Sequence, residues 1–318
     1  MSPTIFLLLG FVLLFLGGEL LVRGSVSLSL KMKISTLVVG MTVVAFATSA
    51  PELFVSLKAI FEGSSNIALG NAIGSNIANI TLVLGVTAII FRVNISKQTL
   101  SLNYPIMLCA SFVLGVVLYF FNGIPVVVGF LFVILLLLFV WVLILISQED
   151  QLKTETKDCE LLEQVPNDPL LKSILVLILG VFLLKYGADF LVHSTKILAK
   201  NFGISDRVIA VTVVAIGTSI PELATSIIAA LKKEENLAVG NLIGSNLFNI
   251  LAVLGITASV KEINIDDAAI FSFDYFWMMV ITLVVGLLIY VFSKQEISRK
   301  EGVFLVLIYL FYMYKTLV

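Results

Sequence analysis

Long apolar runs recur along this chain from end to end, separated by short polar connections. About 20 consecutive apolar residues are enough for one helix to cross a bilayer. The pattern therefore predicts an all-α polytopic membrane protein with ten transmembrane helices. The predicted spans lie near residues 3–22, 36–60, 67–91, 104–121, 125–146, 171–192, 206–231, 237–260, 271–292 and 302–317.

The composition agrees with this pattern and narrows the chemistry. Hydrophobic residues make up 59% of the chain and charged residues 13%, about half the charged fraction of a typical soluble domain. With a net charge of −1 and no basic block, the chain is not expected to bind nucleic acid. Neither Cys109 nor Cys159 has a CxxC partner, so we expect neither a disulfide nor a zinc site. There is a single histidine, His193, and no HExxH motif or nucleophile elbow, so we expect neither an enzyme nor a bound cofactor.

One long polar stretch, residues 147–168, lies between the fifth and sixth predicted spans. It carries seven acidic residues but lacks the spacing of a calcium-binding loop, so we interpret it as a solvated linker. This linker divides the chain into parts 1–146 and 169–318. Thirteen lysines and arginines fall on the linker's side of the membrane and six on the other, which predicts a cytoplasmic linker and external termini.

The chain contains an internal repeat whose copies keep a constant offset in the numbering. Residues 42–53 reappear as 212–223, and residues 70–80 reappear as 240–250, so no gap is needed to align the two halves. Because five predicted spans separate a residue from its copy, the second half would enter the membrane in the opposite orientation. This predicts two inverted five-helix repeats whose motifs face each other near the middle of the membrane.

The first repeated motif should break a transmembrane helix. Pro51 has no N–H group, so the carbonyl of Ala47 loses its helical partner. Thr48 and Glu52 lie four residues apart on one helix face, with Ser49 beside them. An intramembrane glutamate is costly and needs a partner. The second half repeats the arrangement in Thr218, Ser219, Pro221 and Glu222.

The second motif is polar and rich in glycine. Asn71, Ser75 and Asn79 recur every four residues and form one polar stripe, which is copied in Asn241, Ser245 and Asn249. We expect Gly70, Gly74, Gly240 and Gly244 to permit close helix approach.

Together the motifs supply two carboxylates with hydroxyl, amide and carbonyl oxygens, which are the ligands that Ca²⁺ prefers and Na⁺ also accepts. Another matched pair, Glu19 and Asp189, has Arg23 and Lys185 four residues away, and we expect a structural role in helical ion pairs for it. We interpret His193 as a surface residue.

At these motifs the sequence resembles the sodium/calcium exchangers of the calcium/cation antiporter superfamily, of the prokaryotic type. The resemblance covers both motifs and, in outline, the whole chain. It implies that Glu52 and Glu222 are the central calcium ligands, shared with Na⁺, and that the carbonyls of Thr48 and Thr218 also contact Ca²⁺. It further implies sodium-site positions at Ser49, Ser219, Ser75, Ser245, Ala45 and Ala215, and a central amide pair at Asn79 and Asn249.

Two departures from relatives refine this expectation. The potassium-dependent branch carries Asp where this chain has Asn249, so K⁺ co-transport is less favoured here. The proton/cation branch has glutamate where this chain has Gly74 and Gly244, which argues against that branch.

The expected function is therefore secondary antiport of Na⁺ for Ca²⁺ by alternating access, independent of K⁺ and electrogenic, in the plasma (inner) membrane of a prokaryote. The lipid bilayer and the two ions are the expected partners. An H⁺/Ca²⁺ antiporter is the nearest alternative, since the same glutamates could carry protons. A channel would need a continuous pore, whereas paired broken helices favour an occluded site.

Overall fold

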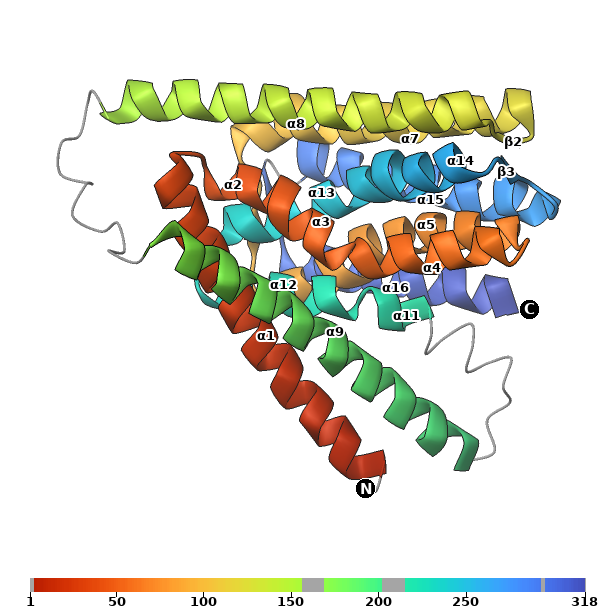
Figure 1. The fold of residues 1–318 in the computed structure, drawn as a ribbon, viewed down its shortest axis with the longest axis horizontal. Helices are drawn as coiled ribbons and strands as arrows, with labels where there is room; N and C mark the ends of the chain where they lie inside the picture. Colours follow the sequence, from red (N-terminus) through yellow and green to blue (C-terminus); the bar gives the residue numbers. More distant parts are fainter. Residues whose placement is uncertain (1–2, 156–168, 202–214, 293–294, 318) are drawn as a thin grey trace.

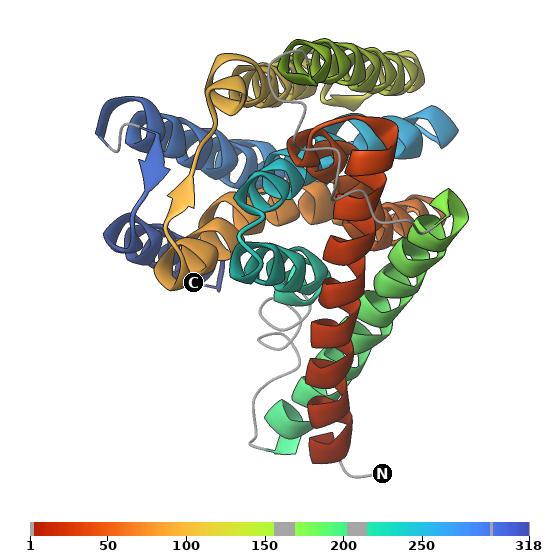
Figure 2. The same ribbon diagram turned by 90° about the vertical axis from the view of Figure 1, so that its left-hand side faces the viewer.

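The computed structural model describes residues 3–155, 169–201, 215–292 and 295–317. This part of the chain is almost entirely helical, and most of its helices run along the long axis of the molecule (Figure 1). Two helices, α1 (Pro3–Met32) and α9 (Leu170–Asn201), pack on each other and cross the rest at an angle. Figure 2 shows this pair extending beyond the other helices.

The first half continues after α1 with elements that include π-helical segments, labelled η. These elements are α2 (Thr36–Val39), η1 (Gly40–Val44), α3 (Ala45–Thr48), α4 (Ala50–Phe61), α5 (Ser65–Ala78), η2 (Asn79–Val83), α6 (Leu84–Ile90), β1 (Val93–Asn94), η3 (Thr99–Asn103), α7 (Tyr104–Phe121), β2 (Gly123–Ile124) and α8 (Val126–Glu155).

The second half repeats much of this order after α9. Its described elements are α11 (Ala215–Thr218), α12 (Ile220–Leu231), α13 (Glu235–Phe248), η6 (Asn249–Leu254), α14 (Gly255–Val260), β3 (Ile263–Asn264), η7 (Ile270–Tyr275), α15 (Phe276–Leu287), η8 (Leu288–Phe292), β4 (Glu296–Ile297) and α16 (Arg299–Leu317).

Seven helical segments of the described chain are long and apolar enough to span a bilayer, and a bent pair can make an eighth crossing. The bent pair, Thr36–Thr48 and Ala50–Phe61, turns by 42° at its break. The predicted span 206–231 falls partly on residues 202–214, which lie outside the described residues. The predicted span 302–317 is helical in α16. The structure thus shows a polytopic helical membrane protein.

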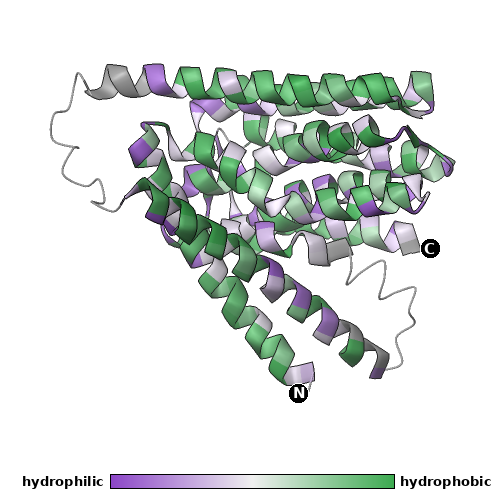
Figure 3. Ribbon diagram, viewed as in Figure 1, coloured by the Kyte–Doolittle hydropathy of each residue, from purple (hydrophilic) through white to green (hydrophobic). Residues whose placement is uncertain are grey.

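Exposure distinguishes the outer helices from the central ones. In the most apolar window of α8 only 28% of residues are buried, and Figure 3 shows this helix hydrophobic along most of its length. A helix that is apolar on all sides suits contact with lipid. The window in Glu235–Val260 is instead 100% buried, which places most of α13 and all of η6 at the centre of the molecule.

Contacts between the two halves occur in reciprocal pairs. Strand β1 of the first half pairs with β4 of the second, and β2 pairs with β3, which is the equivalent of β1 in the second half. The amide of Asn76 donates to the Met278 sulfur, and that of Asn246 donates to the Met107 sulfur, both at 3.7 Å. A two-fold relation between the halves produces this kind of reciprocity.

Glycines on α1 and α9 bring the two antiparallel backbones together. A Cβ at Gly10 would lie 2.9 Å from the Gly187 carbonyl oxygen, and one at Gly17 would lie 2.7 Å from the Leu184 nitrogen. Small residues permit the close van der Waals packing that holds helices together in lipid. The hydroxyls of Ser27 and Ser173 meet at 2.8 Å at the polar end of the pair.

Glycines also allow α13 to pack closely against α2 and η1 of the first half. A Cβ at Gly240 would lie 2.4 Å from the Leu37 carbonyl oxygen, and one at Gly244 would lie 2.7 Å from Met41. Close helix approach is therefore found at these two glycines, as expected. At Gly70 and Gly74 no described residue comes within 4 Å of such a carbon. The second-half equivalents of Leu37 and Met41, residues 207 and 211, lie outside the described residues, so the expectation for these two glycines stays a prediction.

Several helices continue beyond the apolar runs that predicted them. Helix α1 extends to Met32, well past the predicted end at residue 22, and α9 extends to Asn201. Helix α8 continues to Glu155, so the first part of the polar stretch 147–168 is helical. Hydropathy marks the part of a helix that lies in lipid, and the polar turns beyond it remain helical.

The α1–α9 contact predicts an effect of overpacking. We expect Gly17→Val to lower the thermal stability of the purified protein, because the new side chain would overlap the α9 backbone, at a cost of about 1–3 kcal/mol. Leu16→Val is the control, since Leu16 is 45% exposed on the same helix. Equal melting temperatures for the two variants, measured by fluorescence in detergent, would show that the backbones are not in close contact.

Candidate functional site

Two helix breaks define the candidate site. Helix α3 ends at Thr48 and α4 begins at Ala50, with Ser49 between them at φ −85° and ψ 1°. In the second half Ser219 separates α11 from α12 with nearly the same angles, φ −90° and ψ 3°. A proline lies in the first turn of each following helix, as the sequence predicted. Both breaks therefore occur at equivalent positions of the repeat.

Each break places a glutamate in the first turn of a new helix. Glu52 lies in the first turn of α4 and Glu222 in that of α12. The N-terminus of a helix carries a partial positive charge that favours a nearby carboxylate. This arrangement lowers the free energy that is needed to bury a negatively charged carboxylate inside the protein.

The two carboxylates are buried and close enough to interact electrostatically. Glu52 and Glu222 are each 1% exposed. Oxygen Oε2 of Glu52 and both oxygens of Glu222 have no hydrogen-bond partner among the described residues. The negative charges of the two side chains repel each other. Buried carboxylates of this kind require a cation or a proton to offset the cost of burial.

Hydroxyl groups from both halves surround the carboxylates. Ser75 lies beside Glu52, and Thr48 lies beside Glu222. The Thr48 hydroxyl also donates to the side-chain oxygen of Asn241 at 3.2 Å and lies 3.4 Å from the Ser245 hydroxyl. Thr48 thus joins the first break to the polar stripe of the second half.

The amide pair lies at the start of two π-helical segments. Asn79 begins η2 and Asn249 begins η6, and both side chains are buried. The Asn249 amide nitrogen donates to the side-chain oxygen of Asn76 at 3.1 Å, so the Asn249 oxygen is directed away from that bond. That oxygen, and both polar atoms of Asn79, have no partner among the described residues. π-helical turns often occur at functional sites.

The remaining predicted site residues differ in their surroundings. Ser49 and Ser219 are buried, and neither hydroxyl has a partner among the described residues. The Ala45 carbonyl accepts the Ser49 N–H at 2.9 Å. Thr218 is half-buried and lines a cavity. Ala215 begins α11, but its side chain lies outside the described part of the chain.

Three asparagines outside the predicted site support it. The Asn71 amide donates at 3.0 Å to both the Glu52 carbonyl and the Ser56 hydroxyl, and so braces the start of α4. Asn241 contacts Thr48, and Asn76 holds Asn249. The repeat of the Gly-Asn-x-Ile-Gly-Ser-Asn pattern contained all three, but their contacts join segments that are far apart in the chain.

Two cavities lie between α9 and the helix breaks. One, of about 340 Å³, is lined by Thr48, Pro51 and Pro221 among mostly apolar residues. The other, of about 320 Å³, is lined by Thr218, by both prolines and by the polar side chains Lys185, Asp189 and His193 of α9. They provide space next to the threonines on the α9 side of the site.

The expected roles of the second acidic pair need correction. Glu19 pairs with Lys232 at 2.5 Å and not with Arg23, because the end of α12 reaches α1 here. Within the described chain, Asp189 and Lys185 form no ion pair and both are exposed. His193 is exposed, as expected for a surface residue. Among the described residues, no group of three or more His, Cys, Asp or Glu side chains is arranged so that it could hold a metal ion.

Comparisons with known proteins identify similar chains. The sequence profile of the sodium/calcium exchanger protein family matches residues 2–145 and 172–318. The chain is 37% identical over 316 residues to the CaxA protein of Alkalimonas amylolytica, a match that covers 98% of this chain and 97% of that one. It is 31% identical to the sodium/calcium exchanger MaX1 of Methanosarcina acetivorans, with 96% of each chain covered.

The fold also matches a solved structure. The sodium-calcium exchanger NCX_Mj, soaked with Na⁺ and Ca²⁺, superposes on this chain with a TM-score of 0.80 and 28% sequence identity. The match covers 98% of each chain.

Buried carboxylates without partners predict stabilisation by a bound cation. We expect Ca²⁺ to raise the melting temperature of the purified protein, because binding at 100 times Kd stabilises the folded state by about 2.7 kcal/mol. Glu222→Gln should remove most of this rise. The exposed Glu62→Gln should keep it, since Glu62 lies on the surface beside Lys58. A rise of equal size in all three proteins would place the bound cation elsewhere.

Proposed function

Because this chain belongs to the sodium/calcium exchanger protein family, we propose that it is a secondary antiporter that exchanges Na⁺ for Ca²⁺ across a membrane by alternating access. The main support is the pair of buried glutamates, Glu52 and Glu222, which begin two broken helices and have oxygens without hydrogen-bond partners among the described residues. The family consists of exchangers, which move ions and do not transform them.

In this proposal the site binds cations through oxygen atoms of both halves. Glu52 and Glu222 hold Ca²⁺ or Na⁺, and the backbone carbonyls of Thr48 and Thr218 contact Ca²⁺. The positions proposed for Na⁺ and for the central amide pair are Ser49, Ser219, Ser75, Ser245, Ala45, Ala215, Asn79 and Asn249.

Competition for the same carboxylates couples the two ions. Two carboxylates balance the charge of one Ca²⁺, so the loaded site is close to neutral in a medium of low dielectric constant. An unloaded site would bury two uncompensated negative charges, which opposes the conformational change. The protein therefore changes the side to which the site opens only when Ca²⁺ or Na⁺ is bound, and this converts shared binding into exchange.

We propose that the chain forms ten transmembrane helices in two inverted repeats, 1–146 and 169–318, joined by the linker 147–168. The reciprocal strand pairs and the reciprocal contacts of Asn76 and Asn246 support this relation. The excess of lysine and arginine on the linker's side supports a cytoplasmic linker and external termini in a prokaryotic plasma membrane.

A proton-coupled exchanger is the second candidate, because the carboxylate oxygens without partners could carry protons in place of Na⁺. Uptake of Ca²⁺ into liposomes distinguishes the two, with an outward Na⁺ gradient in one sample and an outward H⁺ gradient in the other. Uptake driven by the Na⁺ gradient alone supports the proposal. Uptake driven by the H⁺ gradient alone supports the alternative.

The first prediction from the proposed function concerns the two glutamates. Glu52→Gln or Glu222→Gln should abolish Na⁺-driven Ca²⁺ uptake, because one divalent ion then faces a single carboxylate. The control is Glu62→Gln, which changes an exposed ion pair at the end of the helix that carries Glu52 and should transport normally. Near-normal uptake by either site variant would contradict the proposed site.

The second prediction concerns potassium. Uptake should be equal within about twofold in K⁺-free and K⁺-containing media, because Asn249 supplies no third carboxylate to balance a further monovalent ion. Choline replaces K⁺ to keep the ionic strength constant. Strict dependence on K⁺ would show that the amide pair does not determine ion selectivity.

The third prediction concerns membrane potential. If the sodium-loaded site holds more positive charge than its two carboxylates balance, an inside-positive potential should speed Ca²⁺ entry coupled to Na⁺ exit. Each net charge experiences about 2.3 kcal/mol per 100 mV. Uptake is measured in Na⁺-loaded liposomes with the potential clamped by a K⁺ ionophore. Uptake that does not respond to voltage would mean electroneutral exchange or an additional carboxylate, such as Asp189.

A further inference from the structure

The α1–α9 pair contacts the two broken helices unequally. Helix α1 packs directly on α12, since a Cβ at Gly18 would overlap the Ile228 side chain and lie 3.5 Å from the Ala224 carbonyl oxygen. Helix α9 is instead separated from α4 by the two cavities beside the helix breaks, whose lining includes Pro51 and Val55 of α4. The helix pair is therefore closed on the second half and open on the first.

Equivalent positions of the repeat differ in exposure in the same way. Val55 of α4 is 40% exposed and lines a cavity, whereas its equivalent on α12, Thr225, is 0% exposed. The Thr225 hydroxyl has no hydrogen-bond partner among the described residues. A buried hydroxyl without a partner carries a desolvation cost, which water removes once that helix face is exposed. If the two halves exchanged their arrangements, Thr225 would line a cavity and Val55 would be covered.

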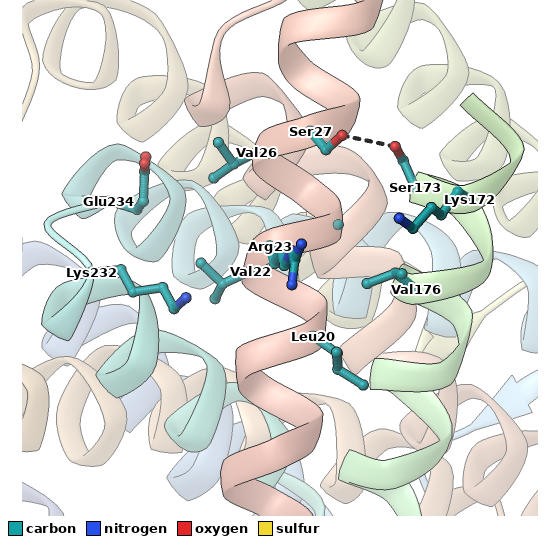
Figure 4. A pocket seen from close by; sticks show the side chains of 11 residues that line it. Leu20, Val22, Arg23, Val26, Ser27, Lys172, Ser173, Val176, Lys232 and Glu234 are labelled. Atoms are coloured by element: carbon teal, nitrogen blue, oxygen red, sulfur yellow. Dashed lines mark hydrogen bonds between the residues drawn. The ribbon is translucent and has the colours of Figure 1, made fainter. Parts of the chain in front are cut away.

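An ion pair joins α1 to α12 at the end of their contact. Lys232, which follows the last residue of α12, lies 2.5 Å from Glu19 of α1, and the two side chains are 35% and 37% exposed. Figure 4, a close view of the pocket beside this ion pair, shows Lys232 extending from the end of α12 toward α1. The first turn of the same helix carries Glu222. The ion pair therefore connects α1 to the helix that carries a proposed cation ligand.

The first half has no equivalent of this ion pair in the described chain. The counterpart of Glu19 in the repeat is Asp189 on α9, and the counterpart of Lys232 is Glu62 at the end of α4, so both counterparts are acidic. Glu62 pairs with Lys58 of its own helix at 3.8 Å, and Asp189 forms no ion pair among the described residues. An exchange of the two arrangements would therefore break the Glu19–Lys232 pair without forming an equivalent one at these positions.

We propose that the Glu19–Lys232 ion pair is a one-sided latch, which favours the state in which α1 covers α12 over a second state in which a cavity separates them. The proposal rests on the alternating access of the proposed function for the existence of the second state. A partly exposed ion pair of this kind changes the ratio of two states about two- to fivefold. The latch thus biases the conformational equilibrium and does not itself bind the transported ion.

Cysteine labelling of the full-length purified protein tests the proposal, in a background in which Cys109→Ala and Cys159→Ala remove both native thiols. Thr225→Cys places a thiol on the covered part of α12, so a charged, water-soluble maleimide reaches it only in the second state. With Ca²⁺ held at one concentration, Glu19→Gln should speed this labelling about two- to fivefold. The charge-exchanged variant Glu19→Lys/Lys232→Glu should restore the slow rate.

Two controls separate the latch from a general effect on folding. Arg92→Gln removes another ion pair between the halves, with Glu296 of β4 at 3.3 Å, and should leave the labelling of Thr225→Cys unchanged. Ser111→Cys, at a buried position on α7, reports loss of folding. Its labelling should stay slow when Glu19→Gln is also present.

Salt provides a second measurement. An about tenfold rise in choline chloride concentration should screen the ion pair and speed the labelling of Thr225→Cys, but not when Glu19→Gln is also present. The proposal is overturned if Glu19→Gln does not speed labelling, if Arg92→Gln speeds it equally, or if Ser111→Cys is labelled faster as well. Labelling needs no ion flux. Failure of the latch would therefore leave Na⁺-driven uptake in place, and failure of the proposed exchange would leave the labelling response in place.

Discussion

The structure depends on the cost of burying two like-charged carboxylates in the middle of a membrane protein. Glu52 and Glu222 are almost completely buried and repel each other. Neither has a basic partner in the described chain. A fixed lysine or arginine at this position would neutralise the site permanently. Because the opposite charge is not built into the described chain, a cation or a proton from solution has to offset the cost of burial, and the proposed function assigns this role to Ca²⁺ and Na⁺.

The surrounding helices stabilise the two carboxylates without forming an ion pair with either of them among the described residues. Each proline break starts a helix at the glutamate, so the positive end of the helix faces the carboxylate. Glycines allow α13 to approach the first half closely, which brings Asn241 and Ser245 to Thr48. Asn71 and Asn76 then hold the backbone at Glu52 and the amide of Asn249. All of these asparagine and serine side chains are neutral, so none of them replaces a cation as the partner of the carboxylates.

The sequence was sufficient for features that depend on local chemistry or on the repeat. Proline at positions 51 and 221 located both breaks, because a missing N–H interrupts a helix wherever it falls. Contacts between distant segments were not predictable in this way. Glu19 was expected to pair with Arg23 one turn away, but it pairs with Lys232, which belongs to the other half of the chain. The polar ends of α1 and α8 were missed because hydropathy reports contact with lipid and not helix length.

The reciprocal strand pairs have a consequence for how the chain is made. Val93 in the first half pairs with Ile297, and Ile124 pairs with Ile263. Because β3 and β4 both belong to the second half, a ribosome must synthesise the chain through Ile263 before Ile124 can pair, and through Ile297 before Val93 can pair. The first half is therefore synthesised with β1 unpaired, and β1 is paired only after β4 has been made. Long-range contacts of this kind slow folding and leave early intermediates exposed to misassembly. A chain truncated before β4 would remain in that early state, because β1 would have no strand to pair with.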